Sequence, residues 1–225
     1  MKFLLAQEHI DHFNKFGSIE FTNIFSEKEC QSLLHSAEEL LNKRINPTNR
    51  NPVHLFSNEN LFLNTKNLWK DGLPIKKLCI KKQLAELAHH LFRKKPIRLA
   101  YDHYIRTGTL QDCPFKEDST IQEISSIRPT LGALFILLEP LPSSIENPAI
   151  PKQVGSMVFV ANNVILPLVN LFSEKNLSML MIAFTAGKPL YCLETKDPHT
   201  HSFKREGLVF GDTVGEDLCP TLYAC

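Results

Sequence analysis

The sequence lacks the features that mark several specialised classes of protein. Its six cysteines include no CxxC pair, and its 9 glycines and 14 prolines are an ordinary share of 225 residues. This excludes a zinc knuckle, a small disulfide framework and a collagen-like or linker sequence. There is also no charge excess, because 25 Lys and Arg face 24 Asp and Glu. A net charge of +1 argues against a nucleic-acid binder, which usually carries basic residues to neutralise phosphates.

Long apolar runs are missing as well. The longest, Leu131 to Leu138, is far shorter than the ~20 residues a membrane-spanning helix needs. The apolar start, residues 1–6, ends at Gln7 and is too short for the core of a signal peptide. We therefore expect a cytoplasmic protein with reduced thiols and no membrane partner. Dinucleotide-binding, phosphate-binding and hydrolase glycine motifs are absent too.

The first 95 residues carry helical patterns. Ser26-Glu27-Lys28-Glu29 is a capping box, in which a hydroxyl and a carboxylate satisfy the first free amides of a helix. Apolar residues then recur at helical spacing up to Leu41. Gly17 marks the end of an earlier, shorter helix. A further helix follows Pro74 and is predicted to bury four side chains: Leu84, Leu87, Ala88 and Leu91.

After Pro96 the pattern changes to short apolar stretches separated by Pro, Gly, Asn and Asp. Such stretches predict strands. The predicted strands begin near Ile97 and include 130–138, 156–161, 164–172, 178–184, 189–193 and 207–210. Many short strands at this spacing are typical of a sandwich or jelly roll. We expect one α+β domain over 1–225, with a mainly helical layer over 1–95 and a β core over 96–225.

Four stretches, in this order and spacing, resemble the phytanoyl-CoA dioxygenase-like family. They are 13–30, with its Phe, Gly, short strand and acidic helix start; 84–99, a helix leading into a strand; Tyr101-Asp102-His103-Tyr104-Ile105-Arg106; and 131–160, two strands before a turn. The resemblance covers most of the chain. It implies a double-stranded β-helix, a jelly-roll or cupin-like core, and an oxygenase that uses Fe(II) and 2-oxoglutarate.

The family holds iron with a His-x-Asp motif and a distant His, and the open face of the metal takes the co-substrate. Here the first motif falls on Lys116-Glu117-Asp118, so Asp118 matches and Lys116 replaces the His. An ammonium has no lone pair and must lose a proton, from a pKa of ~10.4, before it can bind a metal. The alternative is that Lys116 pairs with Asp118 and fills the space of the metal. A shifted alignment is a third possibility.

The resemblance also implies a distant metal ligand and an anchor for the co-substrate. His199 is the candidate for the distant ligand, with His201 and Glu194 as alternatives. An Arg binds the far carboxylate of 2-oxoglutarate in this family, because its planar fork matches a carboxylate. Arg205 is the first candidate for that role and Arg106 the second. Tyr101 could donate a hydrogen bond at the mouth of the β core.

Two hypotheses follow. In the favoured one, the protein keeps the fold, has lost the standard iron site and binds a small molecule or a partner, in a cavity between the sheets. Its ligand is then small and anionic. In the other, it is an active oxygenase that hydroxylates a small organic substrate with iron held by Asp118 and His199. The first hypothesis is preferred because Lys116 must lose a proton, at a cost in free energy, before it can bind a metal.

Overall fold

The computed structural model describes residues 5–45, 56–108, 110, 112–141 and 146–224. The helices of the first part of the chain are α1 (Gln7–Phe16), α2 (Glu27–Ile45), α3 (Asn58–Asn64), the short 3-10 helix η2 (Leu68–Lys70), α4 (Leu73–Cys79) and α5 (Lys82–Phe92). The predicted capping box is confirmed, because the Ser26 amide donates to Glu29 Oε2 at 2.8 Å and the Glu29 amide donates to Ser26 Oγ at 3.3 Å. Gly17 caps α1 in the left-handed conformation, also as predicted.

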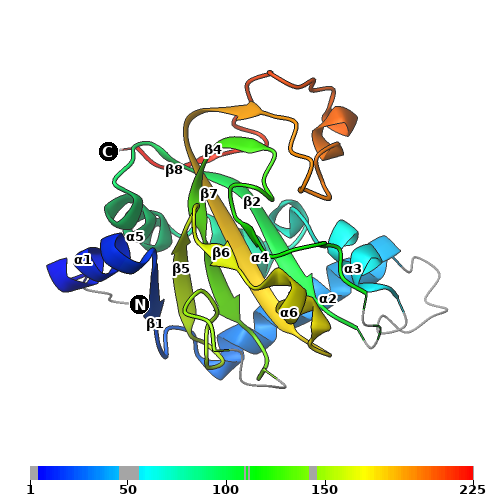
Figure 1. Cartoon of the computed structure of the whole chain (residues 1–225), viewed down its shortest axis with the longest axis horizontal. Helices are drawn as coiled ribbons and strands as arrows, with labels where there is room; N and C mark the ends of the chain where they lie inside the picture. The colour runs from blue at the N-terminus through cyan, green and yellow to red at the C-terminus, as the bar shows by residue number, and fades with distance from the viewer. Residues whose placement is uncertain (1–4, 46–55, 109, 111, 142–145, 225) are drawn as a thin grey trace.

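The strands are β1 (Ser18–Phe21), β2 (Ile97–Arg106), β3 (Ser119–Thr120), β4 (Ile127–Leu137), β5 (Met157–Ala161), β6 (Ile165–Leu166), β7 (Ser178–Tyr191) and β8 (Thr221–Tyr223). Six of them form an antiparallel sheet in the order β1-β5-β4-β7-β2-β8, and β3 pairs with β6. In Figure 1 the large sheet crosses the middle of the molecule, α1 and α5 lie beside it, and β6 and α6 (Leu168–Ser173) lie in front. The mixed architecture and the antiparallel sheet agree with the expected fold class.

Two apolar clusters cover the two faces of the large sheet. Leu99, Leu134 and Ile182 point to one face and pack with residues of the helices α2, α4 and α5. Tyr101 and Phe135 point to the other face, where they pack with residues of β6 and α6. Alternate residues of a strand face opposite sides of its sheet, so the strands are buried on both sides and carry continuous apolar runs. We call the second cluster the β-core interior.

Two strand predictions are wrong. Within 164–172 only Ile165–Leu166 is a strand, since Pro167 starts the helix α6, whose Leu168 and Leu171 are buried three residues apart. Residues 207–210 form no strand. They follow the 3-10 helix η3 (Ser202–Glu206), which Gly207 ends with φ 82°. A glycine in this left-handed conformation turns the chain, so the apolar residues after it do not continue into an extended strand.

Two further expectations concern membrane-spanning helices and the state of the cysteines. No helix of the described residues is long and apolar enough to cross a membrane. The described cysteines are all free: Cys30, Cys79 and Cys219 are buried, and Cys113 and Cys192 are half-buried. Cys225 lies outside the described residues.

Candidate functional site

A short segment before η2 docks on the edge of β2 and carries a lysine into the molecule. Lys66 forms an isolated bridge with His103. On either side, the Asn67 amide donates to the Asp102 carbonyl at 2.9 Å and the Tyr104 amide donates to the Thr65 carbonyl at 3.0 Å. This pairing sets Lys66 beside His103, and its ammonium lies 4.1 Å from the centre of the Tyr101 ring. The Lys66 side chain therefore faces the β-core interior.

The partner of this ammonium is the carboxylate of Asp197. Lys66 Nζ lies 3.7 Å from Asp197 Oδ2, and their side chains are only 6% and 1% exposed. The same oxygen accepts hydrogen bonds from the Ser126 amide at 3.0 Å and the Ser126 hydroxyl at 2.8 Å. Asp197 Oδ1 accepts the amide of His199 at 2.8 Å. A buried charge is tolerated when it is paired and hydrogen-bonded, and Asp197 satisfies both conditions.

Two histidines share one backbone acceptor next to this pair. His103 Nε2 lies 2.9 Å and His199 Nε2 3.2 Å from the carbonyl oxygen of Phe62, and the two rings are 5.2 Å apart. A carbonyl only accepts, so both Nε2 atoms carry the proton. Burial, and then the neighbouring His199 and Lys66 charges, lower the pKa of His103 well below its ordinary value. Burial and then Lys66 do the same to His199, so both rings are neutral at pH 7.

Burial also perturbs the lysine and the tyrosine. It lowers the pKa of Lys66, and the nearby Asp197 carboxylate offsets part of this shift. It raises the pKa of Tyr101, and Asp197 adds to that rise. Ser125 is close to the Tyr101 hydroxyl, but no group among the described residues makes a hydrogen bond of ordinary geometry with it. The Tyr101 ring thus lies against the Lys66 ammonium, and its hydroxyl is a buried donor without a hydrogen bond of ordinary geometry. We call Lys66, Tyr101, His103, Asp197 and His199 the buried polar cluster.

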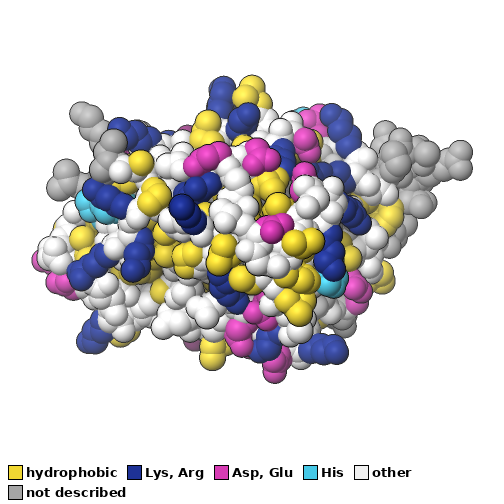
Figure 2. Space-filling view, turned by 90° about the horizontal axis from the view of Figure 1, so that it is seen from above, with side chains coloured by type: hydrophobic (Ala, Val, Ile, Leu, Met, Phe, Trp, Pro, Cys, Tyr) yellow, Lys and Arg dark blue, Asp and Glu magenta, His cyan; other side chains and the backbone are white. Residues whose placement is uncertain are grey.

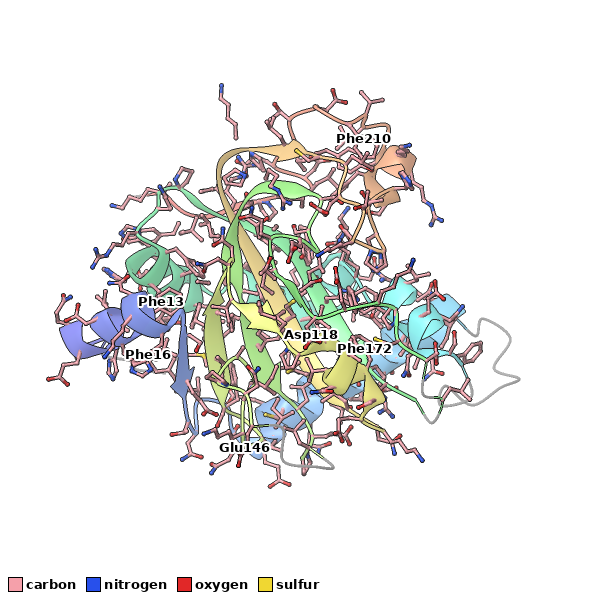
Figure 3. The ribbon with its side chains drawn as sticks, in the orientation of Figure 1. Phe13, Phe16, Asp118, Glu146, Phe172 and Phe210 are labelled. Atoms are coloured by element: carbon pink, nitrogen blue, oxygen red, sulfur yellow. The ribbon has the colours of Figure 1, made fainter. Side chains whose placement is uncertain are left out.

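Two of the residues singled out in the sequence, Tyr101 and His199, meet in this cluster. Asp118 lies elsewhere: it is exposed, and its Oδ1 accepts the amide of Val169 at 3.0 Å near the start of α6. Figure 3 shows Asp118 near α6, well below Phe210, which follows η3. Lys116 is exposed, and among the ion pairs of the described residues none joins it to Asp118.

The two arginine candidates are not in the cluster. Arg106 lies on the side of β2 that faces α2, where its Nε is 2.9 Å from Glu38 Oε1. Tyr104 donates to the same Glu38 oxygen at 2.6 Å. Arg205 is exposed on η3, and the strand predicted directly after it, at 207–210, does not form. The structure therefore gives Arg106 a carboxylate partner within the chain and leaves Arg205 at the surface.

The three candidates for the distant metal ligand lie in different surroundings. His201 is exposed and lies 5.8 Å from the ring of Phe210. Glu194 forms an ion pair with Arg128 at 2.8 Å. His199 is the buried one of the three and the one that reaches the β-core interior.

The residues of the cluster do not fit an iron ion as they stand. Both oxygens of Asp197 accept protein donors, and a lysine ammonium already supplies the positive charge beside it. Both histidines use Nε2 as a donor, so only the Nδ1 atom of each ring keeps a lone pair for a metal. Across the described part of the chain, no three His, Cys, Asp or Glu side chains are grouped so that they could hold a metal ion.

Sequence reasoning missed Lys66, His103 and Asp197 as members of this site. One signal was available for His103, because it stands two residues from Tyr101 in a strand-like stretch and so shares its face. Asp197 stands two residues before His199 in a loop, a spacing that has no fixed meaning. No local signal identifies Lys66, since its neighbours match no pattern and its partner is 131 positions away.

Comparisons with known proteins place the fold. No protein-family model matches the chain, and no curated protein matches it significantly. Among solved structures, the non-heme alpha ketoglutarate dependent carbocyclase SnoK from nogalamycin biosynthesis is 14% identical, with TM-score 0.68 over 96% of both chains. The epimerase SnoN, in complex with Fe3+, alpha ketoglutarate and nogalamycin RO, is 12% identical, with TM-score 0.69 over 96% of this chain and 98% of that one.

A third similar structure is CytC3 with Fe(II) and alpha-ketoglutarate. It is 12% identical, with TM-score 0.56 over 85% of this chain and 81% of that one. Identities this low establish a shared fold and leave the chemistry open. The chain therefore has the fold of the non-heme alpha ketoglutarate-dependent enzymes.

Proposed function

We propose that the chain is a phytanoyl-CoA dioxygenase-like protein with a double-stranded β-helix core, that it has lost the standard iron site, and that it acts as a small-molecule-binding or interaction protein. The fold similarity over almost the whole chain supports the first part. Lys116, at the position where the family has its first iron ligand, supports the second.

One observation carries the proposal: the acidic and imidazole groups of the β-core interior already have protein partners. Asp197 accepts Ser126 and faces Lys66, and the two histidines donate to the Phe62 carbonyl. A metal would have to displace the ammonium from Asp197, and it would have to bind the imidazoles through Nδ1 or break their Nε2 hydrogen bonds. Removing one partner from a buried polar network costs more than a surface change, because the remaining group stays unsatisfied. This supports a metal-free role.

The ligand we propose is a small anion or an acidic group on a partner, bound in the cytoplasm. Nucleic acid and membranes are not expected partners. On the face that Figure 2 shows, basic, acidic and hydrophobic side chains interleave, and this mixture supports that part of the proposal. A surface with mixed charges creates no strong field to gather a polyanion.

The test is a titration with Fe(II), without oxygen, in the presence and absence of 2-oxoglutarate. The melting temperature is followed because a ligand at about 100 times its dissociation constant stabilises the native state by ~2.7 kcal/mol. We expect no specific shift and a metal-free preparation. A shift that is lost in Asp118→Ala and His199→Ala, and kept in the exposed control His201→Ala, contradicts the proposal.

The second candidate is an active oxygenase that hydroxylates a small organic substrate. The observation that favours it is the similarity to SnoN and CytC3, whose structures contain iron and alpha ketoglutarate. In this candidate Asp118 and His199 bind the metal and Arg205 or Arg106 holds the co-substrate, which requires the exposed Asp118 to leave Val169 and move to His199. The same titration decides between the two, since only the second predicts that iron and 2-oxoglutarate stabilise the protein together.

A further inference from the structure

The carboxylate of Asp197 is bound by donors from two distant parts of the chain. Lys66 comes from the segment before η2, and Ser126 comes from the start of β4. We propose that Lys66, Ser126 and Tyr101 form a binding site for a small carboxylate ligand, and that Asp197 fills this site in the present structure. The inference rests on the proposed binding function and locates its anion site away from Arg106 and Arg205.

Two of the donors around Asp197, the Lys66 ammonium and the Tyr101 hydroxyl, do not make an ordinary hydrogen bond to its carboxylate. Its Oδ2 takes both donors of Ser126, but Lys66 Nζ stays at 3.7 Å, beyond an ordinary hydrogen bond. The hydroxyl of Tyr101 is buried with no ordinary hydrogen bond from the described residues. A buried donor left without a partner is costly, so such a group in a native structure requires an explanation. A carboxylate that approaches Lys66 and Tyr101 more closely than Asp197 does explains both groups.

Asp197 belongs to a segment, residues 192–200, that apolar burial does not anchor. Within it only Asp197 and His199 are buried, whereas Leu193 is 58% exposed. Hydrophobic burial supplies most of the free energy that fixes an ordinary core segment. Here two polar side chains enter the interior instead. Displacing the segment breaks polar contacts, among them those of the Asp197 carboxylate with Lys66 and Ser126. An incoming carboxylate forms the same contacts with these two residues.

Besides the packing of the His199 ring on Phe62 at 5.3 Å, residues 192–200 make several ion pairs. Glu194 pairs with Arg128, and Lys196 lies 2.8 Å from both Glu117 and Glu123. The carboxylates of Glu117 and Glu123 are 66% and 41% exposed. Ion pairs this exposed contribute little to stability, because water and salt screen them. Figure 1 shows the chain between β7 and β8 passing over the upper end of the molecule, outside the large sheet.

The experiment compares the whole protein with the variants Asp197→Asn and Lys66→Met. Acetate and succinate are the probes, titrated at constant ionic strength against chloride, and the melting temperature is followed. Asn has nearly the shape of Asp and leaves no hole, so binding to this variant requires the segment to move. Because a resident competitor lowers apparent affinity by the fraction of open protein, we expect Asp197→Asn to bind about tenfold tighter or more. Lys66→Met should abolish binding.

A second measurement covers the case in which Lys66→Met does not fold. Hydrogen exchange of residues 192–200 in the unmodified protein should increase when acetate or succinate is added, with little change in β4 and β7. Ser126→Ala removes one donor and should weaken binding, whereas Lys204→Met, an exposed change on η3, should leave it unchanged.

The outcomes separate this inference from the proposed function. If folded Asp197→Asn binds no better than the unmodified protein and exchange does not change, the carboxylate site is wrong and the loss of iron is unaffected. If iron and 2-oxoglutarate stabilise the protein, the proposed function is wrong, and the comparison of Asp197→Asn with Lys66→Met still decides whether the site exists.

Discussion

The Lys66 ammonium lies 3.7 Å from the Asp197 carboxylate inside the β core, with both side chains almost fully buried. The pair joins a segment of the helical part of the chain to a loop near the C-terminus. It also places a protein cation in the β-core interior, beside the two buried histidines His103 and His199. The salt bridge expected from the sequence between Lys116 and Asp118 is not among the ion pairs of the described residues, and the buried lysine–aspartate pair is Lys66–Asp197.

Breaking this pair should destabilise the protein strongly. Asp197→Asn leaves a buried ammonium without its counter-charge, which costs about 3–5 kcal/mol in comparable sites. Urea unfolding at pH 7.5 measures the loss. Glu123→Gln removes a carboxylate from another lysine, Lys196, at the surface and should change stability little. Equal losses in the two variants would contradict the role given to burial.

The two buried histidines should make the protein less stable in mild acid. Their pKa values are lowered in the folded state, so below about pH 6.5 the unfolded chain binds protons that the folded chain does not. Stability is then fully present above this pH and is lost as the pH falls. Each histidine that takes up its proton only in the unfolded chain lowers stability by up to ~1.4 kcal/mol per pH unit below that pH.

Asp102 opposes the loss of stability that the two histidines cause in mild acid. Burial raises its pKa to about 7, so the folded state binds its proton first. We expect a net loss of stability as the pH falls, because two histidines act against one carboxyl. In His103→Gln with His199→Gln, where Gln can still donate to the Phe62 carbonyl, the pH dependence should reverse. His35→Gln, an exposed control, should keep the original slope.

Asp102 can also be tested alone. Its carboxylate accepts the amides of Leu68 and Trp69 at 3.0 Å each, and Asn keeps an acceptor oxygen there. A raised pKa means that its stabilising contribution is present at low pH and lost as the pH rises toward 7. Asp102→Asn should therefore gain stability relative to the unmodified protein between pH 5 and pH 8. A difference that stays constant with pH would show that Asp102 does not titrate there.

Replacing two glycines by alanine distinguishes the cost of an unfavourable backbone angle from the cost of a steric clash. Gly132 has φ 149°, and a Cβ there would lie 2.1 Å from the Val160 carbonyl oxygen and 2.8 Å from the Phe92 ring. Gly187 has φ 61° and no atom within 4 Å of such a Cβ. Gly187→Ala should cost about 1–2 kcal/mol through its left-handed backbone alone. Gly132→Ala should cost clearly more, because the paired strand β5 must move; thermal unfolding of both variants measures the difference.

The local features of this protein were readable from its sequence. Ser26 and Glu29 lie three residues apart and cap α2 by themselves, and Leu84, Leu87, Ala88 and Leu91 are buried as their spacing predicts. Both depend on neighbours within one turn of helix, so no distant contact is needed to fix them. The change from helical to strand patterns near Pro96 was readable for the same reason.

The candidate site was not readable in this way. Tyr101 and His199 were identified separately from the sequence. Lys66, His103 and Asp197 become part of a site only because the fold brings the edge of β2 and residues 192–200 together. Likewise, 207–210 has the composition of a strand, yet Gly207 turns the chain before one can pair. The sequence by itself determined the helices, most strands and the residue types available. Only the tertiary structure decided which charges are buried together, because the contacts that pair them join residues 131 positions apart.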